Sequence, residues 1–99
     1  MVGNNRAAIS LSDQQLQVTG ELDFVTVVPL LTSSLPLLSR CAEYQFNLAG
    51  VTVCNSAALA LLIEWRRLAQ QNNKRIVFHN VPQQLLTVAA ISGIKNILF

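Results

Sequence analysis

The stretch between residues 44 and 73 places the tightest limits on the fold. Apolar residues alternate with polar ones over residues 44–49, which predicts a buried central strand. A short turn is expected over residues 50–54, followed by a long helix over residues 57–71. A second strand is predicted at residues 75–78. A strand, a helix and a strand in succession imply a right-handed crossover with parallel pairing of the two strands.

The residues before this stretch predict a hairpin and a first helix. Residues 7–11 and 15–20 alternate and are separated by a Ser-Asp turn, so they are expected to pair as antiparallel strands. Thr26 is a candidate N-cap for a helix that starts at the next residue. Pro36 removes a helical hydrogen bond, so a kink or an early stop is expected near residues 33–34.

The residues after it predict one more helix and an ambiguous end. Pro82 opens a helix over residues 83–91, which a Ser-Gly pair ends. Residues 97–99 could add a short strand or simply pack against the core. The elements together predict a single α/β domain over residues 1–99. Its mixed β-sheet would have four to five strands, with three to four helices mainly on one face.

The composition favours a protein that binds another protein. Hydrophobic residues make up 52% of the chain and charged residues only 12%, about half of the usual share. Some apolar surface should therefore stay exposed, as in a binding face. The net charge is +2 and no basic run is longer than two residues. Nucleic-acid binding would need lysine and arginine clustered on one face, so no nucleic-acid partner is expected.

Two short stretches and the two cysteines indicate the cellular location and the redox state of the chain. Residues 1–6 are polar and no apolar segment follows them, so no signal peptide is expected. The most apolar run, residues 57–63, is far shorter than the roughly 20 residues of a spanning helix. A cytoplasmic protein without direct membrane insertion is predicted. Cys41 and Cys54 are distant in sequence and lack a metal-binding pattern, so free thiols and no metal site are expected.

A helical wheel divides the long helix into two sides. One side carries Ala58, Leu61, Leu62, Trp65, Leu68 and Ala69 and should cover the sheet. The opposite side carries Ser56, Leu59, Ala60, Ile63, Arg67 and Gln70. A solvated face would carry lysine and glutamate, whereas this one has apolar residues at its centre. An apolar stripe with polar borders is typical of a helix-mediated protein interface. The alternative is that another helix of the same domain covers it.

Ser56 has two possible roles at the start of the long helix. A serine there can cap a free backbone N–H, which stabilises a helix by about 1 kcal/mol. Asn55 could provide the cap equally well. Ser56 would then leave its hydroxyl exposed at a helix N-terminus, where a phosphate is electrostatically favoured. Phosphorylation would add roughly 1.5–2 negative charges in the middle of the proposed interface.

Catalysis and small-ligand binding are the weaker alternatives. Ser56, Asp23 and His79 could be arranged as a triad, but no G-x-S-x-G motif surrounds the serine. His79 is the only histidine in the chain. The sequence therefore predicts neither an enzyme nor a bound cofactor. A domain of 99 residues also has little room for a lipid chain beside its core.

Two motifs resemble the STAS domain family. Residues 55–59, Asn-Ser-Ala-Ala-Leu, are similar to the family signature D-[ST]-[small]-G-[aliphatic] after the third strand. Residues 20–23, Gly-Glu-Leu-Asp, match the family motif G-[DE]-[LI]-D after the second strand. Residues 81–94 resemble the final helix of the family. The resemblance covers essentially the whole chain and implies a STAS-type fold.

Two short sequence segments resemble one branch of this family, the small MlaB-type subunits of Mla phospholipid ABC transporters. The shared features are Ala-Leu-Ala-Leu-Leu at residues 58–62 and Val-Pro-Leu at residues 28–30. The resemblance implies a non-catalytic regulatory subunit in the maintenance of outer-membrane lipid asymmetry. Such a subunit would bind the transporter's ATPase and lie at the inner membrane through that partner. Its implied partner-binding residues are Asp23, Asn55, Ser56, Leu59, Ala60, Ile63 and Arg67.

A second branch of the family implies a different partner. Anti-sigma-factor antagonists bind a serine kinase that also acts as an anti-sigma factor, and the kinase modifies the serine of the Asp-Ser pair. Here Asn55 replaces the aspartate and Ala58 replaces the glycine. The lost carboxylate argues against phosphorylation of Ser56 but leaves an interface role intact, since Asn55 can still donate and accept hydrogen bonds.

Overall fold

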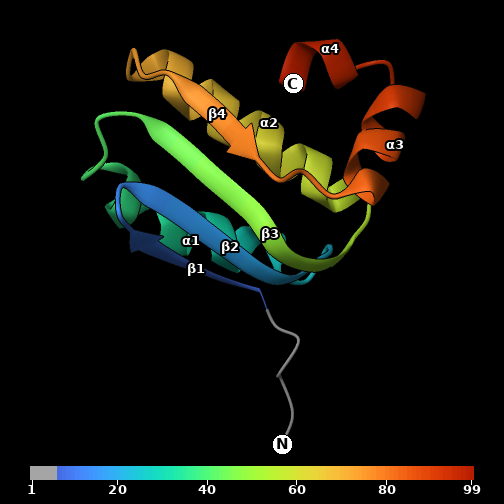
Figure 1. Cartoon of the computed structure of the whole chain (residues 1–99), viewed down its shortest axis with the longest axis horizontal. Coiled ribbons are helices and arrows are strands. Elements are labelled where there is room, and N and C mark those ends of the chain that lie inside the picture. The colour runs from blue at the N-terminus through green and yellow to red at the C-terminus, as the bar shows by residue number, and fades with distance from the viewer. Residues whose placement is uncertain (1–6) are drawn as a thin grey trace, which may run out of the picture.

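A four-stranded mixed sheet forms one layer of the computed structural model, which describes residues 7–99 (Figure 1). The strands lie in chain order. β1 (Ala8–Ser12) pairs antiparallel with β2 (Gln15–Leu22). β2 pairs parallel with β3 (Tyr44–Cys54), and β3 pairs parallel with β4 (Ile76–His79). The expected hairpin and parallel crossover are both confirmed.

Four helices complete the domain: α1 (Val27–Leu38), α2 (Ser56–Gln71), α3 (Gln83–Ile91) and the short α4 (Lys95–Leu98). In Figure 1 the sheet lies in front of α1 and α2, and the face turned to the viewer carries no helix of the described residues. The α/β fold class and the one-sided arrangement of the helices are therefore confirmed. The bounds of α3 agree with the predicted residues 83–91.

The core lies between the sheet and α2. Every second residue of β2 and of the first half of β3 turns toward the helices, so Leu16, Phe46 and Leu48 are completely buried. Trp65 of α2 stacks on Phe46 with ring centroids 4.0 Å apart. The predicted inner side of the long helix is therefore the side that covers the sheet.

The turn expected over residues 50–54 is wrong, because β3 continues through it to Cys54. β2 likewise runs on to Leu22 instead of ending at Gly20. The two extensions pair with each other, with Gly20 opposite Val51 and Leu22 opposite Cys54. Register shifts on either side of Gly20 accommodate the glycine-containing segments. Pairing between distant segments thus overrides the local preference of glycine for a turn.

The early stop of the first helix near residues 33–34 is also wrong, since α1 runs through Pro36 to Leu38. Pro36 lies two residues before the helix end and is exposed, as is Thr32, the residue whose carbonyl loses its hydrogen bond. Water can satisfy that carbonyl, which lowers the cost of the proline.

The C-terminal residues are helical and pack on the core. The last residues form α4 rather than a strand, and Leu98 of this helix is buried. The expectation of a polar, signal-free start at residues 1–6 lies outside the described residues.

Candidate partner-binding site

The predicted site lies where two parallel strands end side by side. Leu22 and Cys54 are paired, and the Asn55 amide donates to the Leu22 carbonyl oxygen at 3.3 Å. The chain continues from these strand ends into the loop before α1 and into α2. Asp23 and Ser56 are therefore brought to the same edge of the sheet, a placement that the sequence motifs did not predict.

Asn55 is the residue that caps α2. Its side-chain oxygen accepts a hydrogen bond from the Ala57 amide at 2.8 Å, and its backbone is extended as an N-cap requires. Ser56 is exposed, and its hydroxyl makes no side-chain hydrogen bond within residues 7–99. Ser56 is therefore not the cap of α2, because the neighbouring asparagine already provides it.

The exposed stripe of α2 is narrower than predicted. Ser56, Ala60, Ile63 and Arg67 are exposed, with 46% of Ile63 accessible. Leu59 is only 5% exposed and belongs to the core. Its assignment to the exposed stripe is therefore wrong. The reason is that α2 contacts α1 on one side and α3 on the other, so more of its circumference is covered than the sheet alone would cover.

Arg67 at the far end of the stripe forms an ion pair within the helix. Its guanidinium donates to both carboxylate oxygens of Glu64, one of them at 3.0 Å from Nε. This hydrogen bond holds the pKa of the Glu64 carboxyl below its usual range. Both side chains are solvent-accessible, so a partner could separate them at little cost.

Asp23 organises the loop that leads into α1. One carboxylate oxygen accepts from the amides of Val25 and Thr26 at 2.9 and 3.0 Å. Thr26 occupies the N-cap position but makes no side-chain cap. Its hydroxyl instead donates to the Glu21 carbonyl at 2.8 Å and accepts from the Asp23 amide at 3.0 Å. The carboxylate of Asp23 thus stabilises the loop through these hydrogen bonds.

An apolar rim borders this edge of the sheet and was not predicted. It consists of Phe24 and Val25, each 73% exposed, Val28 at 66% and Val53 at 48%. Phe24 and Val25 follow β2 directly, and Val28 lies in the first turn of α1. Two adjacent large apolar residues in a loop were the sequence feature that could have revealed it.

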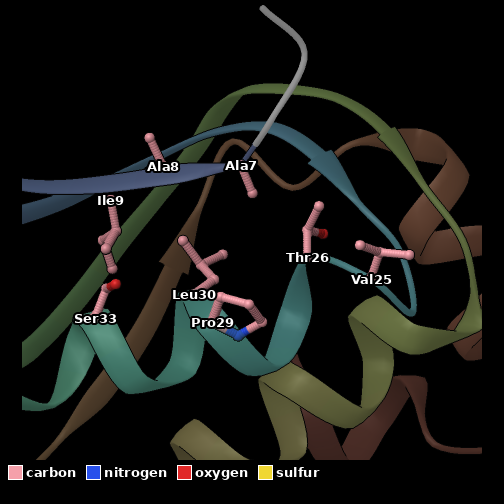
Figure 2. A pocket seen from close by; sticks show the side chains of 8 residues that line it. All are labelled: Ala7, Ala8, Ile9, Val25, Thr26, Pro29, Leu30 and Ser33. Atoms are coloured by element: carbon pink, nitrogen blue, oxygen red, sulfur yellow. The ribbon is translucent and has the colours of Figure 1, made fainter. Parts of the chain in front are cut away.

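A cavity of ≈ 280 Å³ lies between this loop, β1 and α1. In Figure 2, Ile9 points from the strand toward Ser33 of α1, and Leu30 points back toward the strand. Val25 and Thr26 close the end of the cavity nearest the apolar rim. None of the eight lining residues has an ionisable side chain. The cavity could take an apolar side chain but offers no acid or base for chemistry.

The imagined catalytic triad is not assembled. His79 makes its hydrogen bond to Gln45 at 3.1 Å, on the neighbouring strand. The bonds that Asp23 accepts come from its own loop. Within residues 7–99, no three side chains of the His, Cys, Asp and Glu type gather into a group able to hold a metal.

Among the described helices, none has the length and apolar character needed to cross a membrane.

These features define a small α/β domain of the STAS type, with an acidic loop and a serine-bearing helix start at one edge of the sheet. A family model described as "Mlab, STAS domain" matches residues 5–99, and the chain belongs to this family.

Relatives with curated names are anti-sigma-B factor antagonists. The one from Bacillus subtilis (strain 168) is 22% identical over 87 residues, which cover 88% of this chain and 80% of the relative. The one from Staphylococcus epidermidis is 27% identical over 85 residues, covering 85% and 79%. The chain is similar to these proteins over most of its length.

Proposed function

We propose that this chain is a non-catalytic regulatory protein of the cytoplasm that binds another protein through the edge around Ser56. The docking surface would comprise Ser56, Ala60, Ile63 and Arg67 on α2, with Asn55 and Asp23 beside them. The observation that carries the proposal is the exposed Ser56 hydroxyl, which Asn55 leaves free by capping the helix itself.

The partner that we favour is a serine kinase that doubles as an anti-sigma factor. The names of the curated relatives support this choice. Phosphorylation of Ser56 would place about two negative charges at one end of the stripe that contains the half-exposed Ile63, two helical turns away. A partner that has buried this apolar surface would be displaced by the charge and its hydration. The first turn of α2 would at the same time tolerate the phosphate, since a helix N-terminus favours anions.

A second candidate partner is the ATPase subunit of a phospholipid-transport ABC system. The description of the matching family supports it. So does Asn55, because an amide in place of the signature aspartate removes a carboxylate from beside the hydroxyl. In this case the same surface would hold the ATPase permanently, and the protein would lie at the inner membrane through that partner.

Affinity capture with the tagged chain, from both the soluble and the membrane fraction of its native cells, separates the two partners. Four baits would be compared: wild type, Ser56→Ala, Ser56→Glu and Ile63→Asp. Ser10→Glu is the matched control, because it adds the same charge on β1. Wild type and the control are expected to recover the kinase, whereas Ser56→Glu and Ile63→Asp are expected to lose it.

Intact-mass spectrometry of the recovered bait then tests the switch. The kinase hypothesis expects a species heavier by one phosphate in wild type and not in Ser56→Ala. Recovery of an ABC ATPase by both of these baits, without the heavier species, would assign the second partner instead. Recovery of the same partner by Ile63→Asp as by wild type would contradict the docking surface itself.

A further inference from the structure

The outer edge of β4 has no neighbouring strand in the described part of the chain (Figure 1). The Arg75 carbonyl accepts from the Tyr44 amide at 2.8 Å and therefore faces β3. Because the backbone groups of successive residues face opposite edges, Val77 faces β3 as well. Ile76 and Phe78 then turn their N–H and C=O groups outward. The edge offers two donors and two acceptors to an added strand.

A groove of ≈ 390 Å³ runs beside this edge, between β4 and α4. Ile76 and Phe78 belong to one wall, and Ile97 and Phe99 belong to the other. Phe99 packs edge-on against Phe78, with ring centroids 5.8 Å apart. Ile97 nevertheless remains 62% exposed and Phe99 39%. An extended occupant could pair with the strand and cover these apolar side chains at the same time.

The charge of the groove selects the kind of occupant. Arg66 of α2 is the one ionisable side chain that lines it. It is partly buried, yet it has no carboxylate within 4.0 Å and no side-chain hydrogen bond within residues 7–99. The acidic residues of the chain all lie elsewhere: Asp13, Glu21, Asp23, Glu43 and Glu64. An arginine that lines an apolar groove without an acidic partner favours a carboxylate supplied by the occupant.

We propose that this groove binds an extended segment of a partner protein, in which an acidic residue and apolar residues occupy every second position and so share one face of the added strand. The segment would add a fifth strand at β4, place apolar side chains against Phe99 and Ile97, and place its carboxylate on Arg66. A second copy of this chain fits less well, because its own β4 edge would bring another Arg66 and no acid. The proposal uses other elements than the Ser56 surface and holds whichever partner binds there.

Fluorescence anisotropy with synthetic peptides and the full chain tests the chemistry of the groove. The probe is a labelled five-residue peptide, Val-Thr-Glu-Thr-Val, which places its glutamate and both valines on one face of a strand. One control replaces glutamate by lysine, and another carries N-methyl groups on alternate amides, which removes strand pairing but keeps the side chains. We expect the glutamate peptide to bind about tenfold more tightly than the lysine peptide. The N-methylated peptide should not bind measurably.

Amide NMR shifts on adding the glutamate peptide should appear at Ile76, Phe78 and α4. Arg66→Gln should lower the affinity about tenfold, whereas the matched control Arg40→Gln should leave it unchanged, since Arg40 is exposed and does not line the groove. Equal binding of the acidic and basic peptides, or no binding of either, would overturn the proposal. So would a dimer in sedimentation equilibrium whose interface maps to Ile76 and Phe78, because it would assign the edge to a second copy.

Discussion

The indole N–H of Trp65 on α2 donates a hydrogen bond to the hydroxyl of Ser34 on α1 at 3.0 Å, and both side chains are fully buried. Ser34 in turn donates to the Leu31 carbonyl at 2.6 Å. This bond ties together the two helices whose N-termini lie beside the candidate site. A buried polar pair of this kind fixes one arrangement of the helices, because any slip would leave the indole N–H without a partner.

Ser34→Ala should therefore destabilise the domain. The substitution leaves the buried Trp65 donor unsatisfied, which typically costs about 1–3 kcal/mol. Urea unfolding followed by tryptophan fluorescence measures the change directly. Ser33→Ala is the matched control, since Ser33 is the exposed neighbour on the same helix and should change the free energy of unfolding by less than about 0.5 kcal/mol. Equal effects of the two substitutions would contradict the role of the bond.

Substitutions at Leu59 should destabilise the fold much more than substitutions at Ile63. Leu59→Ala removes a buried side chain and should cost about 2–5 kcal/mol of unfolding free energy. Ile63→Ala should cost about 1 kcal/mol or less, and Ile63→Asp should leave the fold intact, because half of this side chain is already in water. Thermal unfolding by circular dichroism checks both. If Ile63→Asp unfolds the domain, the exposed stripe belongs to the core.

The wheel did not separate these two residues, since it placed both on the outer side of the helix. Periodicity correctly identified the side of α2 that faces the sheet, including the fully buried Leu62 and Trp65. It could not show that α1 and α3 flank the helix and cover Leu59, since helix neighbours are set by tertiary contacts. The same limit explains the missed apolar rim. Two adjacent apolar loop residues point to such a rim, but the way the loop leaves β2 decides whether Phe24 is exposed.

The sequence pattern also could not predict the full length of the strands, because tertiary pairing extends them. The alternation of residues 44–48 predicted the first half of β3, where every second side chain enters the core. Its second half breaks the alternation, and it stays in the sheet because residues 50–54 pair with the end of β2. The motif residues Asp23, Asn55 and Ser56 were named from sequence, but their meeting at one edge was not predicted, because the parallel pairing of β2 with β3 was not. Parallel strands end at the same edge, so the pairing of β2 with β3 brings the two motifs together.

Gly50 should resist substitution because of its partner Thr19 on β2. A Cβ at position 50 would lie 2.6 Å from Thr19 Cγ2 and 3.2 Å from the Val18 carbonyl oxygen. Gly50→Ala should therefore cost about 1–3 kcal/mol. In a Thr19→Ala background the nearest clash is removed, and the cost should fall to less than half. A double-mutant cycle in urea measures this coupling, and additive effects would show that Thr19 does not restrict position 50.

The Cys54 thiol should make stability depend on alkaline pH. Cys54 is buried at the end of β3, next to Gln84 of α3, and burial raises the pKa of its thiol above the ordinary value of 9.0. The folded state thus favours the neutral thiol. Its contribution is complete below the unfolded-state pKa and is lost as the pH rises through the higher pKa of the folded state.

Wild type should consequently lose stability relative to Cys54→Ala above about pH 9, while the difference between them stays constant near neutral pH. Urea unfolding of both variants from neutral to strongly alkaline pH tests this, because the other buried thiol, Cys41, is present in both. Thiol alkylation should agree: at neutral pH the folded protein should react far more slowly than the unfolded chain, since burial suppresses the reactive thiolate. A difference in stability that does not change with pH would show that Cys54 keeps an ordinary pKa in the folded state.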